Sequence, residues 1–425
     1  MSKINIPVLN MYYYKDVLDN GLTVYTIPNH NSDNYSCYYY TRFGDYFSEF
    51  VPYNGKKYKK HHLGIAHFLE HKMFEMPDGT NADLYFGKHA LYNNAYTYNN
   101  KTMFLFEARK YQKENINYLL NMVDNLYLTE ENVEKEKGII LSEQRMGANR
   151  NGRIIARHID YMLLKTYPTI DCIIGSPDDI KSISKKELEE CFKTFYNPQN
   201  MAFFVAGDVD HENILKIINE NQSKKERHNY KIDAKKHDEP EELNIKKDSI
   251  EVFINVPKSY CLFKVKIPKE YQKGTLTGYY FSYIRDLLVN RLYGYSQELI
   301  DSKIINKELN GECYQCDDYE MFTFSANTDN EKKFIDEIKR KINNLNSNEE
   351  MYDLYRQDTI NSIIKSSDNN SELINLIMLS YDRIGEFDPQ FLQKTKDSSY
   401  SDFLKFYKSL SFENNGVLTV LPKSK

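Results

Sequence analysis

Residues 63–74 form an almost continuously apolar run in which His67, Glu70 and His71 stand together. Such a run predicts a helix that is buried rather than solvated. Residues four apart share one face of a helix, so the two histidines can bind a single ion together. This is the H-x-x-E-H pattern of an inverted zinc site, in which the histidines bind the metal and the glutamate activates a water molecule.

The alternative is that these histidines are ordinary core residues. A single buried histidine is more often a hydrogen-bonded core residue than a metal ligand. The chain holds 10 histidines and 61 acidic residues among 425, and this composition gives roughly 0.03 chance occurrences of the full pattern. Chance is therefore a poor explanation for the pattern.

A zinc site needs a third protein ligand and an open position for water. Glu136 and Glu143 lie seven residues apart in the run 131–146 and would share a helical face. Residues 138–141 are uncharged and can pack inward, which would carry Glu143 to the interior. A solvated acidic helix with Glu–Lys pairs explains residues 131–137 equally well. From spacing alone, both interpretations of Glu143 stay open.

These residues resemble the pitrilysin/insulinase family of inverted zinc peptidases. The resemblance implies that His67, His71 and Glu143 are the metal ligands, because the family's third ligand is a glutamate some seventy-odd residues after the second histidine. It implies that Glu70 is the catalytic acid and base. The family has a second glutamate seven residues before its third metal ligand, and Glu136 occupies this position. Glu136 is therefore expected to assist catalysis by orienting one of the metal ligands.

Other segments carry the same resemblance. Asn94 and Ala95 open Asn-Ala-Tyr-Thr, which is similar to the family's Asn-Ala-x-Thr segment beside the active site and implies substrate binding. Residues 18–24 resemble the family's opening strand, and the match continues through residues 195–198 to a strand at 201–208. The first half of the chain is closest to the half-length bacterial subunits of the family.

The fold expected from the sequence is α+β, with two related domains that each hold a mostly antiparallel sheet flanked by helices. In family terms this is half of a pitrilysin-type clam shell. The predicted ranges are 1–221 for a metal-bearing catalytic domain, 222–248 for a charged linker and 249–425 for a second domain without metal ligands. The range 249–425 contains no histidine and cannot rebuild the two-histidine site.

Several elements are expected from periodicity and capping signals. Residues 95–106 are rich in β-prone side chains and are expected to form one strand whose free edge pairs with an extended peptide. The alternative is that this strand lies inside its sheet. Helices are expected at 111–125, 130–146, 184–195 and 277–293, with Ser184 as an N-cap, and strands at 22–28 and 35–43.

Composition excludes other classes of function. The formal net charge of −5 is small for this length, and the basic residues are scattered, so no nucleic-acid partner is expected. No apolar run approaches the roughly 20 residues that span a membrane. The N-terminal residues lack the apolar segment of a signal peptide, so a cytoplasmic location is the expectation. The six cysteines are dispersed and do not suggest a disulfide framework.

Together these features predict a zinc endopeptidase with one Zn²⁺ per chain that cleaves short or unfolded peptides. Because full-length family members hold four such domains, we expect a homodimer, or a heterodimer with a related half-length subunit that lacks activity. Processing of precursor or leader peptides is the role that the resemblance implies. Two alternatives stay open, namely a non-catalytic or regulatory subunit of a peptidase complex and a metal-dependent hydrolase acting on something other than peptide.

Overall fold

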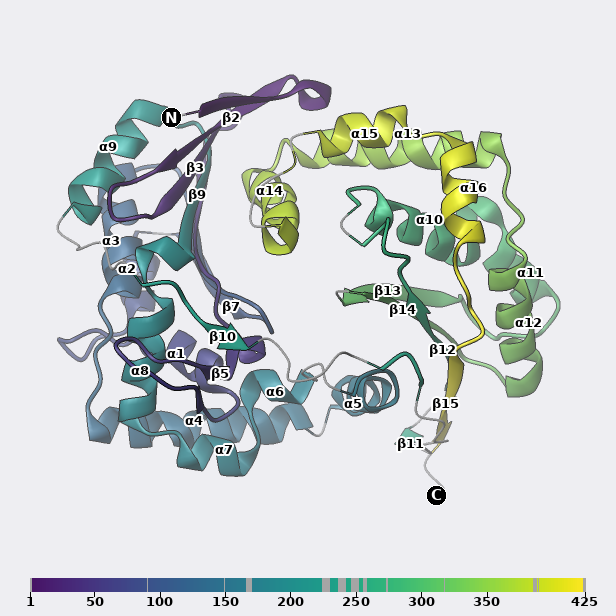
Figure 1. Cartoon of the computed structure of the whole chain (residues 1–425), viewed down its shortest axis with the longest axis horizontal. Coiled ribbons are helices and arrows are strands. Elements are labelled where there is room, and N and C mark those ends of the chain that lie inside the picture. The colour runs from purple at the N-terminus through teal and green to yellow at the C-terminus, as the bar shows by residue number, and fades with distance from the viewer. Residues whose placement is uncertain are drawn as a thin grey trace. The chain divides into compact units, whose positions relative to one another are not determined.

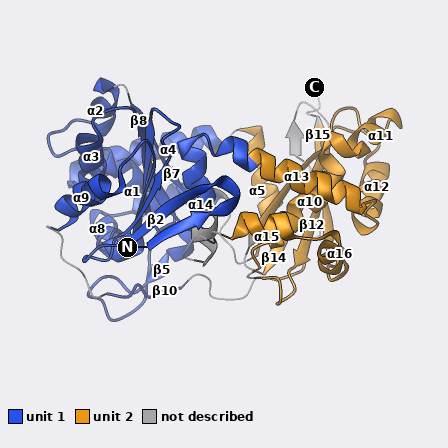
Figure 2. Ribbon diagram, turned by 90° about the horizontal axis from the view of Figure 1, so that it is seen from above, with its two compact units in different colours: residues 1–147, 170–238, 363–389 blue, residues 148–169, 239–362, 390–425 orange. Residues whose placement is uncertain are grey.

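The computed structural model describes residues 2–89, 91–148, 150–165, 170–223, 230–235, 242–245, 252–254, 258–272, 274–316, 318–384, 388 and 390–422. The chain divides into two compact units (Figure 2). Unit 1 comprises residues 1–147, 170–238 and 363–389, and unit 2 comprises residues 148–169, 239–362 and 390–425. Each unit combines a mostly antiparallel sheet with flanking helices, which confirms the expected α+β class.

Unit 1 is built on a seven-stranded sheet in the order β1–β2–β3–β9–β4–β8–β7 (Figure 1). Neighbouring strands are antiparallel except β3 and β9, which are parallel. The strands are β1 Ser2–Ile6, β2 Met11–Val17, β3 Thr23–Pro28, β4 Tyr35–Thr41, β7 Tyr92–Thr97, β8 Thr102–Ala108 and β9 Met201–Gly207. A smaller sheet in the same unit joins β10 Ala234–Lys235, β5 Glu49–Phe50 and β6 Lys59–Lys60.

Helices cover both faces of the large sheet. They are α1 Ile65–Met73, α2 Ala82–Lys88, α3 Gln112–Asp124, α4 Glu130–Ala148, α6 Ile170–Ile174, α7 Pro177–Ser182, α8 Lys185–Phe195, α9 His211–Gln222 and α14 Asn370–Ile384, with 3₁₀ turns η1 Pro7–Leu9, η2 Asp45–Phe47 and η3 Pro198–Asn200. Successive side chains of a strand point to opposite faces. Along β4, Cys37 and Tyr39 join the core that also contains side chains of α1, α3, α8 and α9, whereas Ser36 accepts a hydrogen bond from Ser371 of α14 at 3.1 Å.

Unit 2 contains a five-stranded sheet in the order β11–β15–β12–β14–β13. Its strands are β11 Val252–Ile254, β12 Lys258–Lys266, β13 Asn310–Cys316, β14 Tyr319–Ala326 and β15 Asn415–Pro422. Its helices are α5 Asn151–Leu163, α10 Thr277–Val289, α11 Tyr295–Asp301, α12 Glu331–Asn343, α13 Glu349–Ser366, α15 Phe391–Asp397 and α16 Tyr400–Lys408, with the 3₁₀ turn η4 Arg291–Tyr293. An aromatic core lies between this sheet and α10, α12, α13 and α16.

The compact units differ from the predicted domain ranges in two segments. Helix α5 packs on strands β11, β12 and β15 of unit 2 although it lies within the range 1–221, and α14 packs on β4 and β9 of unit 1 although it lies within 249–425. The predicted linker 222–248 falls partly outside the described residues. Within them, Ala234 and Lys235 form β10 and pair with β5, so this part of the segment belongs to a sheet.

The local predictions differ in accuracy. The structure confirms α3, α4 and α8, and Ser184 and Glu187 form the expected capping box of α8. The single strand 95–106 was wrong, because β7 and β8 are separate strands whose turn is closed by the Tyr98 N–H donating to the Lys101 carbonyl at 2.7 Å. Asparagines 99 and 100 favour such a turn. The helix expected at 277–293 ends at Val289, and the extended Asn290 separates it from the 3₁₀ turn η4.

Candidate metal centre

Helix α1 presents two histidines on one face. His67 and His71 lie one helical turn apart with ring centroids 4.6 Å from each other. The opposite face of the helix is fully buried in the core of unit 1 through Phe68 and Leu69. Because the apolar face fixes the rotation of the helix, the two imidazoles must point out of the core and toward the neighbouring helix α4.

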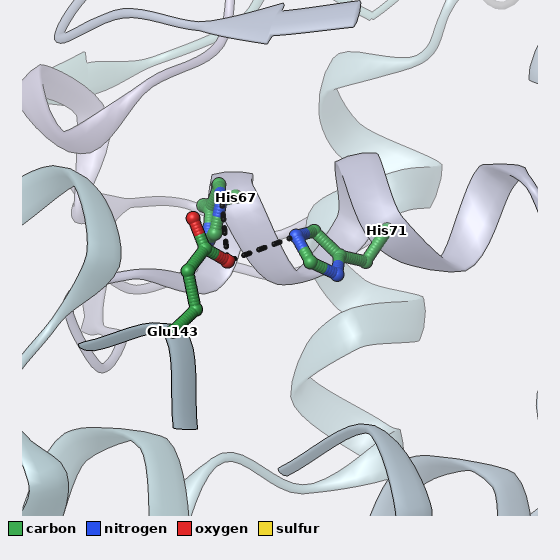
Figure 3. A group of neighbouring side chains, drawn as sticks. All are labelled: His67, His71 and Glu143. Atoms are coloured by element: carbon green, nitrogen blue, oxygen red, sulfur yellow. Dashed lines mark ion pairs between the residues drawn. The ribbon is translucent and has the colours of Figure 1, made fainter. Parts of the chain in front are cut away.

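Helix α4 supplies the third donor. An oxygen of Glu143 lies 3.8 Å from Nε2 of His67 and 3.5 Å from Nε2 of His71 (Figure 3). These three residues are the group, within the described part of the chain, whose donor atoms all lie within 4.8 Å of one another. Ligands about 2.0–2.2 Å from a tetrahedral zinc ion are separated by roughly 3.3–3.5 Å. The donor types and their spacing therefore fit zinc, with the half-exposed Glu143 on the open side of the site.

Glu136 fixes the second histidine. Its Oε1 lies 2.9 Å from Nδ1 of His71, so Nε2 of that ring is left facing Glu143. Burial by itself lowers the pKa of His71, but hydrogen bonds to Glu136 and Glu143 outweigh it and raise the pKa to about 9. Burial raises the pKa of Glu136, yet the same imidazole holds it below its usual value. A carboxylate in this position orients a histidine ligand and strengthens its basicity.

Glu70 lies beside the donors without joining them. It occupies the turn between the two histidines, and its Oε2 accepts a hydrogen bond from the Thr97 hydroxyl of β7. Burial raises the pKa of Glu70 above its usual value, because it outweighs the bond from Thr97 and the neighbouring His71, which both lower the pKa. A half-buried carboxyl with opposing influences on its pKa is suited to accept and return a proton.

A cavity of about 490 Å³ opens beside these residues. Asn94 and Ala95 of β7 line it together with Glu70, His71 and Glu136. The structure therefore brings all seven predicted site residues into one region of unit 1. Five of them line the cavity, and the other two, His67 and Glu143, contact His71. The remaining lining residues are Phe74, Glu75, Gly79, Thr80, Asn81, Asp83, Asn93, Lys135 and Ile139.

The N-terminal end of α1 is held by segments far away in the sequence. Gly64 precedes the helix with φ of +84°, and a Cβ at this position would lie 2.4 Å from the carbonyl oxygen of Ile174. The Gly64 N–H donates to Oδ1 of Asp45 at 3.2 Å. Nearby, His61 and His62 contact two carboxylates of α8. A side chain at Gly64 would both strain the backbone and displace the metal-binding helix.

Sequence reasoning missed three residues that position the site. Asp45 carried no recognisable signal, because a single acidic residue in a loop is usually solvated. Lys72 follows His71 yet is fully buried, where its Nζ pairs with Glu75 and lies 3.4 Å from the Asn132 carbonyl of α4. Thr97 belongs to the Asn-Ala-x-Thr segment, so its place beside the active site could have been extended to a bond with Glu70.

Comparisons with known proteins agree with this geometry. The family model described as insulinase, peptidase family M16, matches residues 56–164, and the model described as peptidase M16 inactive domain matches residues 182–357. The zinc protease YmfH of Bacillus subtilis is 33% identical over 306 residues, which are 71% of this chain and 70% of that protein. The chain belongs to peptidase family M16.

Other proteins match in part or in fold. The human mitochondrial-processing peptidase subunit beta is 29% identical over 164 residues, which are 36% of this M16 chain and 32% of that subunit. A solved M16-like peptidase of Alicyclobacillus acidocaldarius has a TM-score of 0.85 at 23% identity, covering 97% of this chain and 98% of that one. A protease of Helicobacter pylori has a TM-score of 0.81 at 18% identity, covering 97% and 100%.

The family placement agrees with the donor set and with the two α+β units. Relatives named as zinc proteases support zinc as the metal of the family. Among the described residues, no helix combines the length and the apolar character needed to cross a membrane.

Proposed function

We propose that this M16 chain is a zinc-dependent endopeptidase that cleaves short or unfolded peptides. The observation that carries the proposal is the convergence of His67, His71 and Glu143 with a separate carboxyl, Glu70, beside them. Three donors leave an open position in a tetrahedral zinc site, which is the arrangement of catalytic rather than structural zinc. The residues in this unit therefore supply both a metal site and an acid–base group.

The roles of the residues follow from their contacts. When bound, zinc makes a water molecule more acidic and polarises the carbonyl of the scissile bond. Glu70 takes the proton from the water and passes it to the leaving amine, because it is held beside the donors without being one of them. Thr97 fixes the orientation of the Glu70 carboxyl, and Glu136 fixes the tautomer of His71.

Substrate binding by strand addition is part of the proposal. Strand β7 is the last strand of its sheet and pairs only with β8 in the described residues. Its Thr97 contacts Glu70, and its Asn94 and Ala95 line the cavity beside the metal site. An extended peptide that pairs with this edge would pass close to the metal, and pairing of this kind reads main-chain hydrogen bonds more than side chains.

The oligomeric part of the proposal is a dimer, either of two copies or with a related half-length subunit. It is supported by relatives that are themselves named as subunits and by the match of residues 182–357 to an inactive domain. In addition, residues 249–425 contain no histidine. Processing of precursor peptides is proposed from the same relatives. The alternative is a non-catalytic or regulatory subunit, and the match of residues 182–357 to an inactive domain is compatible with it. The cytoplasmic location stays a prediction.

Metal content and hydrolysis test the proposal together. We expect about one zinc per chain. Glu70→Gln should keep the zinc and lose hydrolysis of an unstructured peptide, whereas His67→Ala and Glu143→Ala should lose both. Hydrolysis by Glu70→Gln at the wild-type rate would contradict the catalytic role. Normal zinc binding by Glu143→Ala would show that the third ligand is misassigned and would make Glu136 the next candidate.

Two further measurements test binding and assembly. An unstructured peptide should be cleaved while the same segment within a stably folded protein resists, since a folded protein offers no free strand. Equal cleavage of both would count against strand addition. Size measurement of the chain, alone and mixed with a related half-length chain, should reveal a dimer. Full activity from a strict monomer would contradict the oligomeric part.

A further inference from the structure

The open edge of β7 can be assigned residue by residue. The Tyr98 N–H donates to the Lys101 carbonyl at 2.7 Å and closes the hairpin with β8. Main-chain groups along a strand alternate between its two sides. The backbone groups of Tyr92, Asn94 and Tyr96 therefore face β8, and those of residues 93, 95 and 97 face the open edge. The N–H of Ala95 is the central donor of that edge.

This central donor is already occupied by a side chain of the same strand. The Asn94 Oδ1 accepts a hydrogen bond from the Ala95 N–H at 2.9 Å. The Asn94 Nδ2 donates to the hydroxyl of Tyr92 at 3.1 Å and to that of Tyr96 at 2.7 Å. Both donor hydrogens of the carboxamide are thus used to hold its oxygen over the Ala95 N–H.

The two tyrosines lie on one face of the strand, on either side of Asn94. These two residues are 55% and 39% exposed, so burial does little to fix their hydroxyls, and both hydroxyls accept from the Asn94 carboxamide. The ring of Tyr96 also contacts that of Tyr98, with centroids 6.4 Å apart. A hydrogen bond from the Tyr96 hydroxyl to that of Tyr92 raises the pKa of Tyr96. We call the set of Tyr92, Asn94 and Tyr96 the edge clasp.

We propose that the edge clasp closes the substrate-pairing edge of β7 and that a peptide must displace the Asn94 side chain in order to bind. The proposal rests on strand addition at β7, which is part of the proposed function. An N–H group donates one strong hydrogen bond at a time, so the Ala95 N–H cannot serve Asn94 and a peptide carbonyl together. Tyr92 and Tyr96 are then positioning residues that act through Asn94.

The clasp also has a physical reason to exist in the free protein. An unpaired strand edge with exposed donors and acceptors is a template for unwanted pairing with other chains, and proteins commonly cover such edges. A carboxamide held by two exposed hydroxyls covers the donor with bonds that are individually weak in water. The edge is therefore protected against chance encounters and still opens to an extended chain that offers several main-chain bonds in succession.

Removing only the two hydroxyls tests the clasp. The variant Tyr92→Phe/Tyr96→Phe keeps both rings but frees the Asn94 carboxamide. Hydrogen–deuterium exchange of the zinc-loaded, peptide-free protein should then show the Ala95 amide exchanging roughly two- to ten-fold faster than in the wild type. The edge amides of residues 93 and 97 serve as internal references, and Tyr98→Phe is the matched control beyond the end of the strand.

Kinetics with a flexible peptide supply the second readout. The double variant should show a KM lower by roughly two- to ten-fold at unchanged kcat, because binding no longer requires the clasp to open. Tyr98→Phe should leave both constants unchanged. Unaltered exchange at Ala95, or a KM that rises in the double variant, would overturn the proposal. If neither the wild type nor the variants cleave the peptide, the proposed function is wrong. The exchange rate at Ala95 still decides in that case whether the clasp exists.

Discussion

Asp45 is a carboxyl group that folding buries at the N-terminal end of α1. Its side chain accepts a hydrogen bond from the Gly64 N–H at 3.2 Å, and the residue is only 4% exposed. Burial raises the pKa of Asp45 to about 8, although the bond from Gly64 lowers it. In the unfolded chain the same group titrates near 3.9. Folding at neutral pH therefore traps a proton on Asp45 that the unfolded chain would release.

The sign and size of the effect follow from this difference. Between about pH 4 and about pH 8 the folded state binds more protons than the unfolded state, so the free energy of unfolding falls as the pH rises. The slope is at most about 1.4 kcal/mol per pH unit. The variant Asp45→Asn keeps an oxygen for the Gly64 N–H but does not titrate. When the pH rises by two units, the free energy of unfolding of this variant should therefore increase by up to about 2.7 kcal/mol relative to that of the wild type.

Thermal unfolding of both zinc-loaded proteins at about pH 5.5 and about pH 7.5 measures this gain. Circular dichroism is the suitable probe, since the chain contains no tryptophan. The Tm difference between Asp45→Asn and wild type should widen by roughly 3–5 °C at the higher pH. Asp178→Asn is the control, because its side chain is 95% exposed and should give a constant difference. A difference for Asp45→Asn that stays the same at both pH values would refute the reasoning.

Three further outcomes are expected. Glu136→Gln removes the charge that orients His71 and should weaken zinc binding by about 10- to 100-fold in chelator competition. Gly64→Ala should lower both Tm and zinc content, because its Cβ would meet a carbonyl oxygen at 2.4 Å. Gly79→Ala has a similar φ of +77° with open space, and should keep the zinc. Lys264→Met removes the buried ammonium that donates to the last carbonyl of α5 at 2.6 Å, and should lower the free energy of unfolding by about 1.5–3 kcal/mol in urea.

The metal donors could be predicted from sequence because their geometry is mostly local. A four-residue spacing in an apolar helix fixes His67 and His71 on one face whatever the rest of the fold does. Glu143 was harder, since a charged helix with Glu–Lys pairs has the same pattern when it is solvated. Only the resemblance to a known family favoured it as a ligand, and the structure places its carboxylate within 3.8 Å of both imidazoles.

The parts that could not be predicted depend on contacts between distant segments. An amphipathic pattern shows that α5 or α14 has an apolar face but does not show which sheet covers it, and each packs on the sheet of the other half of the sequence. The same holds for Asp45, which is buried and accepts a hydrogen bond from the Gly64 N–H, 19 residues further along the chain. The turn that separates β7 from β8 was missed because β-prone residues stand on both sides of it, tyrosines before it and Thr102, Phe104 and Phe106 after it. Their preference for strands outweighed the asparagines within the turn.

The contacts around the donors indicate that the fold rather than the metal assembles the site. Helices α1 and α4 are joined by the His71–Glu136 contact at 2.9 Å and by the buried Lys72 near the Asn132 carbonyl. In small zinc domains, by contrast, the ligands come together only when the metal binds, and metal binding supplies the folding energy. Here the apolar face of α1 is buried in a core that needs no metal. The proposed zinc ligands are therefore preorganised, which is the condition for a site whose metal serves catalysis.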